Sequence, residues 1–255
     1  MKLVDTHTHL YLPEFDADRD EMINRAVKNG VVKLLMPNID IKSLDPMLAC
    51  AEKYPGICYP MTGLHPTSVK EDYHLQLEQL ENVTTNNKFI AVGEIGIDLY
   101  WDRTFLKEQK EALHKQIEFA VRYGLPVVIH SRESFPEVFS VIDEFRGEKL
   151  KGIFHAFSGN LHDAIKAIGM GFKLGIGGPL TFKNSGLDKI AKEVGLQNIV
   201  LETDSPYLAP VPYRGKRNES SYICIINRKL AEILGKSDKE VADVTYENAC
   251  RLFNI

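Results

Sequence analysis

Short apolar segments alternate with longer segments of helical periodicity along the whole chain, and this alternation constrains the fold more than any other feature. The short segments are rich in β-branched residues, and loop residues follow each one. Eight strands are predicted in this way, at residues 3–6, 31–36, 57–62, 89–93, 127–129, 152–154, 172–176 and 199–202. Helices are predicted at 18–29, 43–53, 104–123, 137–145, 161–168 and 222–234. A last helix begins at Ser237, which forms a capping box with Glu240.

Strand and helix alternating through eight units predict a parallel sheet with helical crossovers. The 255 residues contain no low-complexity linker or change of composition that would separate two domains. Eight units in about this length favour a closed (β/α)8 TIM barrel over an open doubly wound sheet. We therefore expect residues 1–255 to form one domain.

The composition excludes several classes of protein. With 44% hydrophobic and 26% charged residues, the chain has the profile of a globular protein and not of a disordered or fibrous one. Lys and Arg number 31 against 35 Asp and Glu, a formal net charge of −4. This balance argues against a strongly basic surface that coats nucleic acid, although local basic loops remain open.

The cysteines and the apolar runs indicate in which cellular compartment the protein resides. The four cysteines form no Cys-x-x-Cys pair and are too few for a disulfide framework, which suits a reducing compartment. Asp5, His7 and His9 interrupt the N-terminal stretch before a secretory signal could form. No apolar run approaches the roughly 18 residues of a membrane span. We expect a cytoplasmic protein without a membrane segment, and the sequence indicates no stable protein partner.

Polar residues gather where the predicted strands end, which is where barrel enzymes carry their chemistry. His7 and His9 lie two residues apart, so both imidazoles face the same side of an extended chain. Such a pair is common in proteins that bind no metal. Four other strand ends carry further metal-ligand residue types, which barrel closure would bring to the same place: Glu94, His130, His155 and Asp204.

Four imidazoles and two carboxylates exceed the ligands that one zinc ion takes, so two divalent metal ions are predicted. Glu94 is expected to bridge them, because a carboxylate can offer one oxygen to each ion and a neutral imidazole cannot. The expected ligands are His7, His9 and Asp204 for one ion and His130 and His155 for the other. Two ions roughly 3.5–4 Å apart activate water and stabilise both oxygens of a displacement, which is hydrolase chemistry. Histidines suit Zn or Mn better than Mg, so the identity of the ions stays open.

Carboxylates near these ligands receive further roles. Asp204, next to the activated water, is the candidate general base, so Asp204 and Glu94 are the predicted catalytic residues. Asp5 and Glu202 each lie two residues before a ligand, and we expect them to orient ligand histidines. The alternative is an ion pair inside the barrel that is unrelated to the metals.

In chain order, the segments at the strand ends resemble the TatD family of metal-dependent deoxyribonucleases. They are HTH at 7–9, GEIGID at 93–98, HSR at 130–132, HAFSG at 155–159 and LETDSPYLAP at 201–210, followed by P-x-RGK-x-N at 212–218. The resemblance implies an amidohydrolase-like barrel with the same six ligands. It also implies metal-dependent hydrolysis of DNA phosphodiesters, often by an exonuclease on single strands; the family is usually described as magnesium-dependent. The chain departs from the family at Ser205, where alanine is common, and at Ser220, where proline is.

A DNA substrate would explain the remaining residues near the strand ends as substrate contacts. Arg132 could bind a phosphate oxygen, with His65 donating to the same group, and Arg214, Lys216 and Arg217 form a basic loop for the neighbouring backbone. Trp101, with Tyr100, could stack on an unpaired base or could pack at the barrel rim. Gly175, Gly177 and Gly178 could admit a phosphate or form a tight turn.

Two other functions remain possible at this point. A metal-dependent amidohydrolase or esterase for a small-molecule or aminoacyl ester substrate would use the same metal core, although Arg132 and the basic loop favour a polyanion. A binding scaffold that uses the ions only for stability would not require Asp204.

Overall fold

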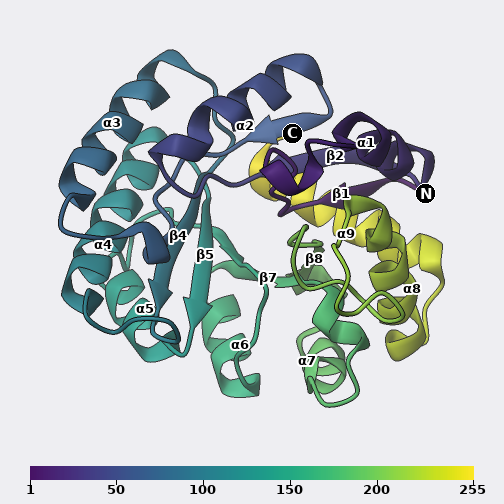
Figure 1. Ribbon diagram of the computed structural model, residues 1–255. Coiled ribbons are helices and arrows are strands. Elements are labelled where there is room, and N and C mark those ends of the chain that lie inside the picture. Colours follow the sequence, from purple (N-terminus) through teal and green to yellow (C-terminus); the bar gives the residue numbers. More distant parts are fainter.

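Every strand of the computed structural model runs parallel to its neighbours, and a helix follows each one (Figure 1). The structure describes residues 1–255 apart from the side chain of Asn86. The strands are β1 (Leu3–Asp5), β2 (Val31–Met36), β3 (Cys58–Pro60), β4 (Val92–Asp98), β5 (Val127–Arg132), β6 (Gly152–Phe154), β7 (Phe172–Ile176) and β8 (Ile199–Leu201). The helices are α1 (Arg19–Lys28), α2 (Ile41–Lys53), α3 (Tyr73–Asn86), α4 (Leu106–Tyr123), α5 (Phe135–Asp143), α6 (Leu161–Gly169), α7 (Leu187–Val194), α8 (Ile223–Leu234) and α9 (Asp238–Phe253).

The strands form two sheets that backbone hydrogen bonds join at both edges. Strands β1 to β3 make one sheet and β4 to β8 the other, each in sequence order. At one edge the amide of Thr6 donates to the carbonyl of Leu201 at 3.1 Å, and at the other edge the amide of Gly93 donates to the carbonyl of Thr62 at 2.7 Å. The ring of strands and the surrounding helices form the predicted (β/α)8 barrel.

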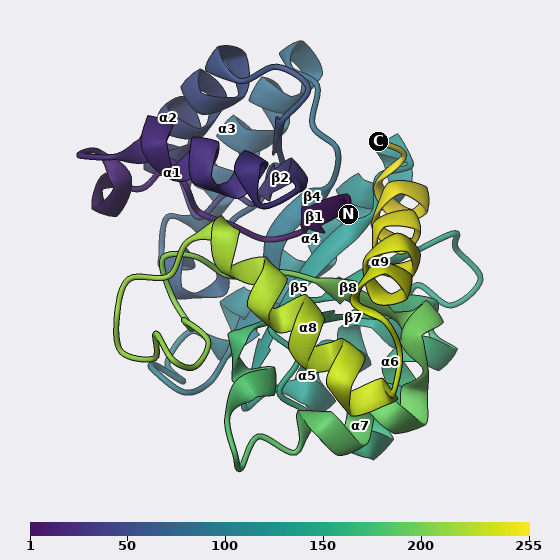
Figure 2. The same cartoon turned by 90° about the vertical axis from the view of Figure 1, so that its right-hand side faces the viewer.

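An apolar layer fills the barrel near the N-terminal ends of the strands, and α9 covers it. The strands and the residues next to them contribute Val4, Leu35, Met61, Ala91, Val128, Ile153 and Val200, and α9 contributes Ala249, Leu252 and Phe253. Figure 2 shows α9, in yellow, beside β1 and β8. Side chains alternate along an extended chain, so the residues two positions beyond this layer also face inward. These residues are His130 on β5, His155 directly after β6 and Glu202 directly after β8, and the apolar layer forms the floor beneath them.

Most predicted strands agree with the structure to within three residues, but the fourth was placed wrongly. It was expected at 89–93 and lies at Val92–Asp98. The Gly-Glu-Ile-Gly sequence reads as a strand end, because glycine and glutamate are poor strand residues. In the structure Ile95 and Ile97 are fully buried and continue the pairing with β5, so Glu94 lies within a strand and not after one.

The helix predictions were incomplete. Helix α3 was missed because its apolar pattern is weak: Tyr73 and Leu80 are buried, but Leu75 is exposed. Helix α7 was also missed, although its buried residues Leu187, Ile190, Ala191 and Val194 follow the helical spacing. At the start of α9, Ser237 accepts a hydrogen bond from the Glu240 amide at 3.1 Å as expected, whereas the Glu240 carboxylate pairs with Lys236. None of the described helices combines the length and the apolar character that crossing a bilayer requires.

Gly96 allows β4 and β5 to approach closely, and this makes a testable prediction. A Cβ atom at Gly96 would lie 1.9 Å from the carbonyl oxygen of His130, and the φ of Gly96 is +150°. Gly124 also has a positive φ, +66°, but nothing lies within 4 Å of its Cβ position. We expect Gly96→Ala to lower the free energy of unfolding by about 2–4 kcal/mol, and the control Gly124→Ala by about 1 kcal/mol. Urea denaturation measures both, and equal losses would contradict the close approach.

Candidate metal centre

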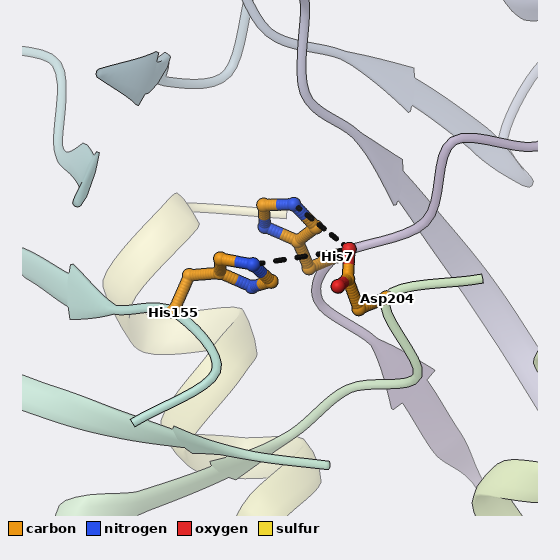
Figure 3. A group of neighbouring side chains, drawn as sticks. All are labelled: His7, His155 and Asp204. Atoms are coloured by element: carbon orange, nitrogen blue, oxygen red, sulfur yellow. Dashed lines mark ion pairs between the residues drawn. The ribbon is translucent and has the colours of Figure 1, made fainter. Parts of the chain in front are cut away.

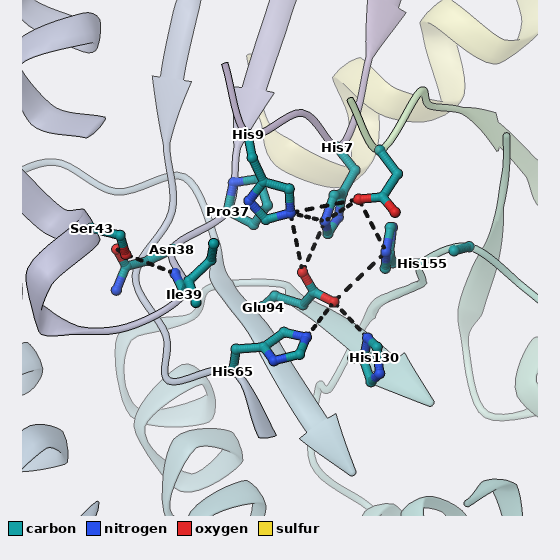
Figure 4. A network of polar contacts seen from close by, with 12 residues as sticks. His7, His9, Pro37, Asn38, Ile39, Ser43, His65, Glu94, His130 and His155 are labelled. Atoms are coloured by element: carbon teal, nitrogen blue, oxygen red, sulfur yellow. Dashed lines mark hydrogen bonds and ion pairs between the residues drawn. The ribbon is translucent and has the colours of Figure 1, made fainter. Parts of the chain in front are cut away.

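The buried carboxylate of Glu94 lies at the centre of a ring of imidazoles (Figure 4). Its Oε2 atom is 2.9 Å from Nε2 of His7 and 3.6 Å from Nε2 of His9. Its Oε1 atom is 2.7 Å from Nδ1 of His130 and 3.2 Å from Nε2 of His65. The two oxygens of one carboxylate therefore face two different pairs of imidazoles.

Asp204 approaches the same cluster from the segment after β8. Its Oδ1 atom lies 3.7 Å from Nε2 of His7 and 3.8 Å from Nε2 of His155 (Figure 3), and 3.6 Å from Nε2 of His9. The rings of His7 and His155 stack with their centroids 3.3 Å apart. All six predicted ligands thus converge at the C-terminal ends of five strands.

The potential ligand atoms form overlapping groups, and His7 and Glu94 each belong to two of them. The groups are His7 with His9 and Glu94, His7 with His155 and Asp204, and His65 with Glu94 and His130. The rings of His155 and His130, which are predicted to hold one ion together, stack with their centroids 6.4 Å apart. Nδ1 of His155 lies 3.0 Å from Oε1 of Glu202.

Charge in the cluster favours a bound cation. Burial raises the pKa of Glu94, but the surrounding histidines outweigh it and hold the pKa well below its usual range. Burial and the charge of His155 lower the pKa of His7 to about 4, so His7 is neutral and keeps a lone pair. Burial also lowers the pKa of His155, but Glu202 and the two central carboxylates outweigh it and raise that pKa to about 10. The position of His155 therefore favours positive charge, whether a proton or a metal ion supplies it.

The second ring nitrogens of three imidazoles face polar partners. Nε2 of His130 lies 2.9 Å from Oδ2 of Asp98, and Nδ1 of His155 lies 3.0 Å from Oε1 of Glu202, an ion-pair contact without hydrogen-bond geometry. Nδ1 of His9 lies 3.0 Å from the hydroxyl of Tyr11, which donates to the carbonyl of Pro37 at 2.7 Å. Metal-ligating histidines usually have such partners, so the donor set and its support fit a divalent metal.

Sequence reasoning missed Asp98 and Tyr11, although both carry a signal. Asp98 lies four residues after Glu94 on β4 and Tyr11 two residues after His9. The period of two along an extended chain places each on the same side as the residue it supports or neighbours.

The role predicted for Asp5 was wrong. Its carboxylate accepts hydrogen bonds from the amide of Thr203 at 2.9 Å and from the hydroxyl of Thr203 at 2.6 Å. It reaches only the main-chain amide of His7, and Nδ1 of His7 has no partner among the described residues. Burial raises the pKa of Asp5 to about 7, against these hydrogen bonds. Asp5 therefore joins β1 to β8 and does not orient an imidazole.

Of the residues expected to contact substrate, His65 lies in the cluster, and Arg132 and Arg214 lie over aromatic rings. His65 belongs to the cluster itself, since its Nε2 faces Glu94 and its Nδ1 lies 2.7 Å from Oγ1 of Thr67. The guanidinium of Arg132 lies over the Tyr100 ring, 3.7 Å from its centroid. Arg214 lies 4.4 Å from the centroid of the Phe182 ring.

Arg217, in contrast, is not available as part of a basic loop. Its guanidinium pairs with Asp18 at 2.7 Å and donates to the carbonyl of Glu14 at 2.7 Å. The hydrogen bond from Arg217, together with one from Arg25, holds the pKa of Asp18 well below its usual range. This network fastens the segment after β8 to α1.

Gly175, within β7, and Gly178, after it, lie so close to other protein atoms that no phosphate fits against them. A Cβ atom at Gly175 would lie 2.2 Å from Oε2 of Glu202, and one at Gly178 would lie 1.9 Å from the carbonyl oxygen of Leu208. These two positions therefore serve the packing of β7 against the segment after β8.

The two positions where the chain departs from the expected family pattern lie together. The hydroxyl of Ser205 is 2.7 Å from that of Thr8, and the hydroxyl of Ser220 donates to Thr8 at 3.2 Å. Thr8 and Ser205 also form the bridge that joins the segments after β1 and β8. Both substitutions thus add hydroxyl contacts beside the cluster.

A (β/α)8 barrel with histidines and carboxylates at its strand ends has the architecture of a metal-dependent hydrolase. The TatD related DNase family matches residues 4–254. The metal-dependent hydrolase YabD of Bacillus subtilis is 35% identical, over 99% of both chains. Human deoxyribonuclease TATDN3 is 32% identical, over 98% of this chain and 94% of its own. The 3'-5' ssDNA/RNA exonuclease TatD of Pectobacterium atrosepticum is 27% identical, over 99% of this chain and 100% of its own.

Among solved structures, the TatD homolog YjjV of Escherichia coli superposes with a TM-score of 0.93 at 30% identity, covering 99% of this chain and 98% of its own. The chain belongs to the TatD related DNase family. The resemblance inferred from the strand-end motifs, the barrel fold and the assignment as a hydrolase are thereby confirmed.

The contact between Asp98 and His130 makes a prediction about metal affinity. Removing a carboxylate that orients a ligand histidine typically weakens metal binding about 10- to 100-fold. We expect Asp98→Ala to show a loss of this size in a competition titration with a chromophoric chelator. Asp102→Ala is the matched control, because Asp102 is half-buried on the following loop, where it accepts a hydrogen bond from the Thr104 amide. Equal affinities of the two variants would show that Asp98 does not support the metal centre.

Proposed function

We propose that this protein is a divalent-metal-dependent deoxyribonuclease that acts as an exonuclease on single-stranded DNA. The relatives named as deoxyribonuclease and as ssDNA/RNA exonuclease support this substrate class. The observation that carries the proposal is that two arginines near the carboxyl ends of the strands have no carboxylate partner among the described residues: Arg132, the last residue of β5, and Arg214, in the segment after β8.

Every other arginine of the described chain forms an ion pair with a carboxylate: Arg19, Arg25, Arg103, Arg122, Arg146, Arg217, Arg228 and Arg251. Arg132 and Arg214 instead lie over the aromatic rings of Tyr100 and Phe182, with Cζ 3.7 Å and 4.4 Å from the ring centroids. Stacking leaves the N–H groups at the edge of a guanidinium free to bind phosphate oxygens. Arg132 and Arg214 are the proposed phosphate contacts.

The residues on the two sides of Glu94 would hold two divalent ions. Its Oε2 faces His7 and His9 and its Oε1 faces His130, which is the arrangement that a bridging carboxylate needs. Asp204 would complete the ligand set of His7 and His9. His155, whose Nε2 lies 3.7 Å from Oε1 of Glu94, would complete the set that contains His130. When bound, two divalent ions of this kind stabilise the attacking and leaving oxygens of a phosphodiester displacement.

Asp204 is proposed to accept the proton of the attacking water. Burial raises its pKa, but the neighbouring histidines, His155 first among them, outweigh the effect and lower it, so the carboxylate is ionised at neutral pH. It belongs to the segment after β8, so it faces the cluster from the side opposite the apolar floor. An ionised carboxylate in this position can take the proton and return it to the leaving oxygen.

We assign this activity to the cytoplasm. All four cysteines are free, and burial raises the pKa of Cys50 and Cys58, which keeps both as unreactive thiols. Free thiols are the usual state in a reducing compartment.

The reaction itself can be tested with metal-stripped protein and single-stranded DNA labelled at its 5′ end. On adding back Mg, Mn or Zn, we expect stepwise shortening of the strand with at least one ion. Asp204→Asn and Glu94→Gln should be inactive, and Asp188→Asn, at an exposed position on α7, should keep wild-type activity. Metal-loaded protein that cuts no DNA but hydrolyses small or aminoacyl esters would contradict the nuclease proposal.

The arginines give a separate prediction. Each phosphate contact on a single strand contributes about 0.7 to the slope of log affinity against log salt concentration. Arg132→Ala and Arg214→Ala should each raise the KM for single-stranded DNA and reduce this slope by about 0.7. Arg146→Ala is the control, because Arg146 is exposed and pairs with Asp143. Slopes that match the wild type would remove both arginines from the substrate site.

A further inference from the structure

Two aromatic side chains stand exposed in the loop after β4, on the side of the barrel where the metal centre lies. Tyr100 is 51% exposed and Trp101, the only tryptophan of the sequence, is 70% exposed. Their rings meet edge to face with centroids 4.9 Å apart. We call Tyr100 and Trp101 the aromatic platform. An aromatic side chain that served only packing would bury most of its surface, so the exposure of Trp101 requires another explanation.

The platform is fixed to the metal centre through one side chain. Oδ1 of Asp98 accepts hydrogen bonds from the amides of Tyr100 at 3.0 Å and Trp101 at 3.3 Å. Oδ2 of the same carboxylate lies 2.9 Å from Nε2 of His130. Asp98 is buried, and its own amide donates a hydrogen bond to Oε1 of Gln109 at 2.8 Å. A base that rests on the platform would therefore have a defined position relative to the ligands.

The platform also lies beside an available phosphate ligand. Arg132 is the pairing partner of Asp98 on the neighbouring strand, and its guanidinium lies 3.7 Å from the Tyr100 centroid and 5.4 Å from the Trp101 centroid. Aromatic rings next to a cation are the pattern by which proteins bind single-stranded nucleic acid, since bases stack on the rings and the backbone follows the charge.

We propose that the aromatic platform is the subsite that binds an unpaired nucleobase of the substrate, while Arg132 binds an adjacent phosphate. This inference rests on the proposed function. Trp101 is 70% exposed although Arg132 lies over the Tyr100 ring, so the indole is the surface on which a base would stack. Every base has a π-face, so binding there requires an unpaired base but no particular one. A base inside a duplex is stacked on both sides and cannot be received, so the platform selects single-stranded over double-stranded ends.

Intrinsic fluorescence tests the contact directly, because Trp101 is the only tryptophan. The full-length Asp204→Asn protein with Mg²⁺ is titrated with a short oligothymidylate and with an abasic strand of equal length. We expect quenching that saturates with oligothymidylate and is weak with the abasic strand. Equal quenching by both strands would overturn the proposal, because a phosphate contact alone would then explain it.

Kinetics with three proteins test the role of the contact. In single-strand hydrolysis, Trp101→Ala should raise KM roughly 5- to 100-fold with kcat little changed. Trp101→Phe should recover most of the loss, since phenylalanine also stacks. On an abasic strand the KM of the wild type should rise by a similar factor. The KM of Trp101→Ala should rise little further on that strand. A KM for Trp101→Ala equal to that of the wild type, or an undiminished abasic effect in this variant, would contradict the proposal.

The two proposals fail in different ways. Hydrolysis of DNA without base-dependent quenching would contradict base binding by the platform and leave the proposed nuclease function standing. Base-dependent quenching without hydrolysis by any metal-loaded wild-type protein keeps the platform as a nucleic-acid binding site and removes the nuclease function.

Discussion

The negative charge of Glu94, buried within a ring of imidazoles, is the interaction around which the C-terminal end of the barrel is arranged. Removing an isolated carboxylate from water costs on the order of several kcal/mol, and here His7, His9, His130 and His65 compensate from the two sides of the carboxylate. Three of those histidines, His9, His130 and His65, have polar partners at their second ring nitrogens. The close approach at Gly96 lets β5 bring His130 to Glu94.

The barrel is organised in three levels along its axis. The apolar layer covered by α9 excludes water beneath the site. The histidines and carboxylates above it carry the charge that a cation balances, in an interior where electrostatic interactions are stronger than in water. Above them, in the surrounding loops, stand the two arginines without carboxylate partners and the exposed aromatic platform. Each level depends on the one below, because Arg132 and Trp101 take their positions from β5 and from Asp98, which also hold His130.

The sequence predicted the alternation of strands and helices and the convergence of six ligand residues, because period and barrel geometry determine both. It did not predict the full extent of β4, since poor strand residues such as Gly93 and Glu94 are retained there by burial and pairing. Nor could it separate Asp5 from Glu202: both lie two residues before a ligand, yet only the tertiary structure shows that Asp5 binds Thr203 and Glu202 faces His155. Likewise Arg217 and Arg214 lie in one basic segment, and only the position of Asp18 decides which of them is paired.

The proposed bridging of two divalent ions by Glu94 can be tested by anomalous diffraction from crystals grown with manganese. We expect two anomalous peaks per chain, one on each side of the Glu94 carboxylate, with His7, His9 and Asp204 at one peak and His130 and His155 at the other. A single peak, or two peaks that Glu94 does not contact, would contradict a bridging role for this carboxylate.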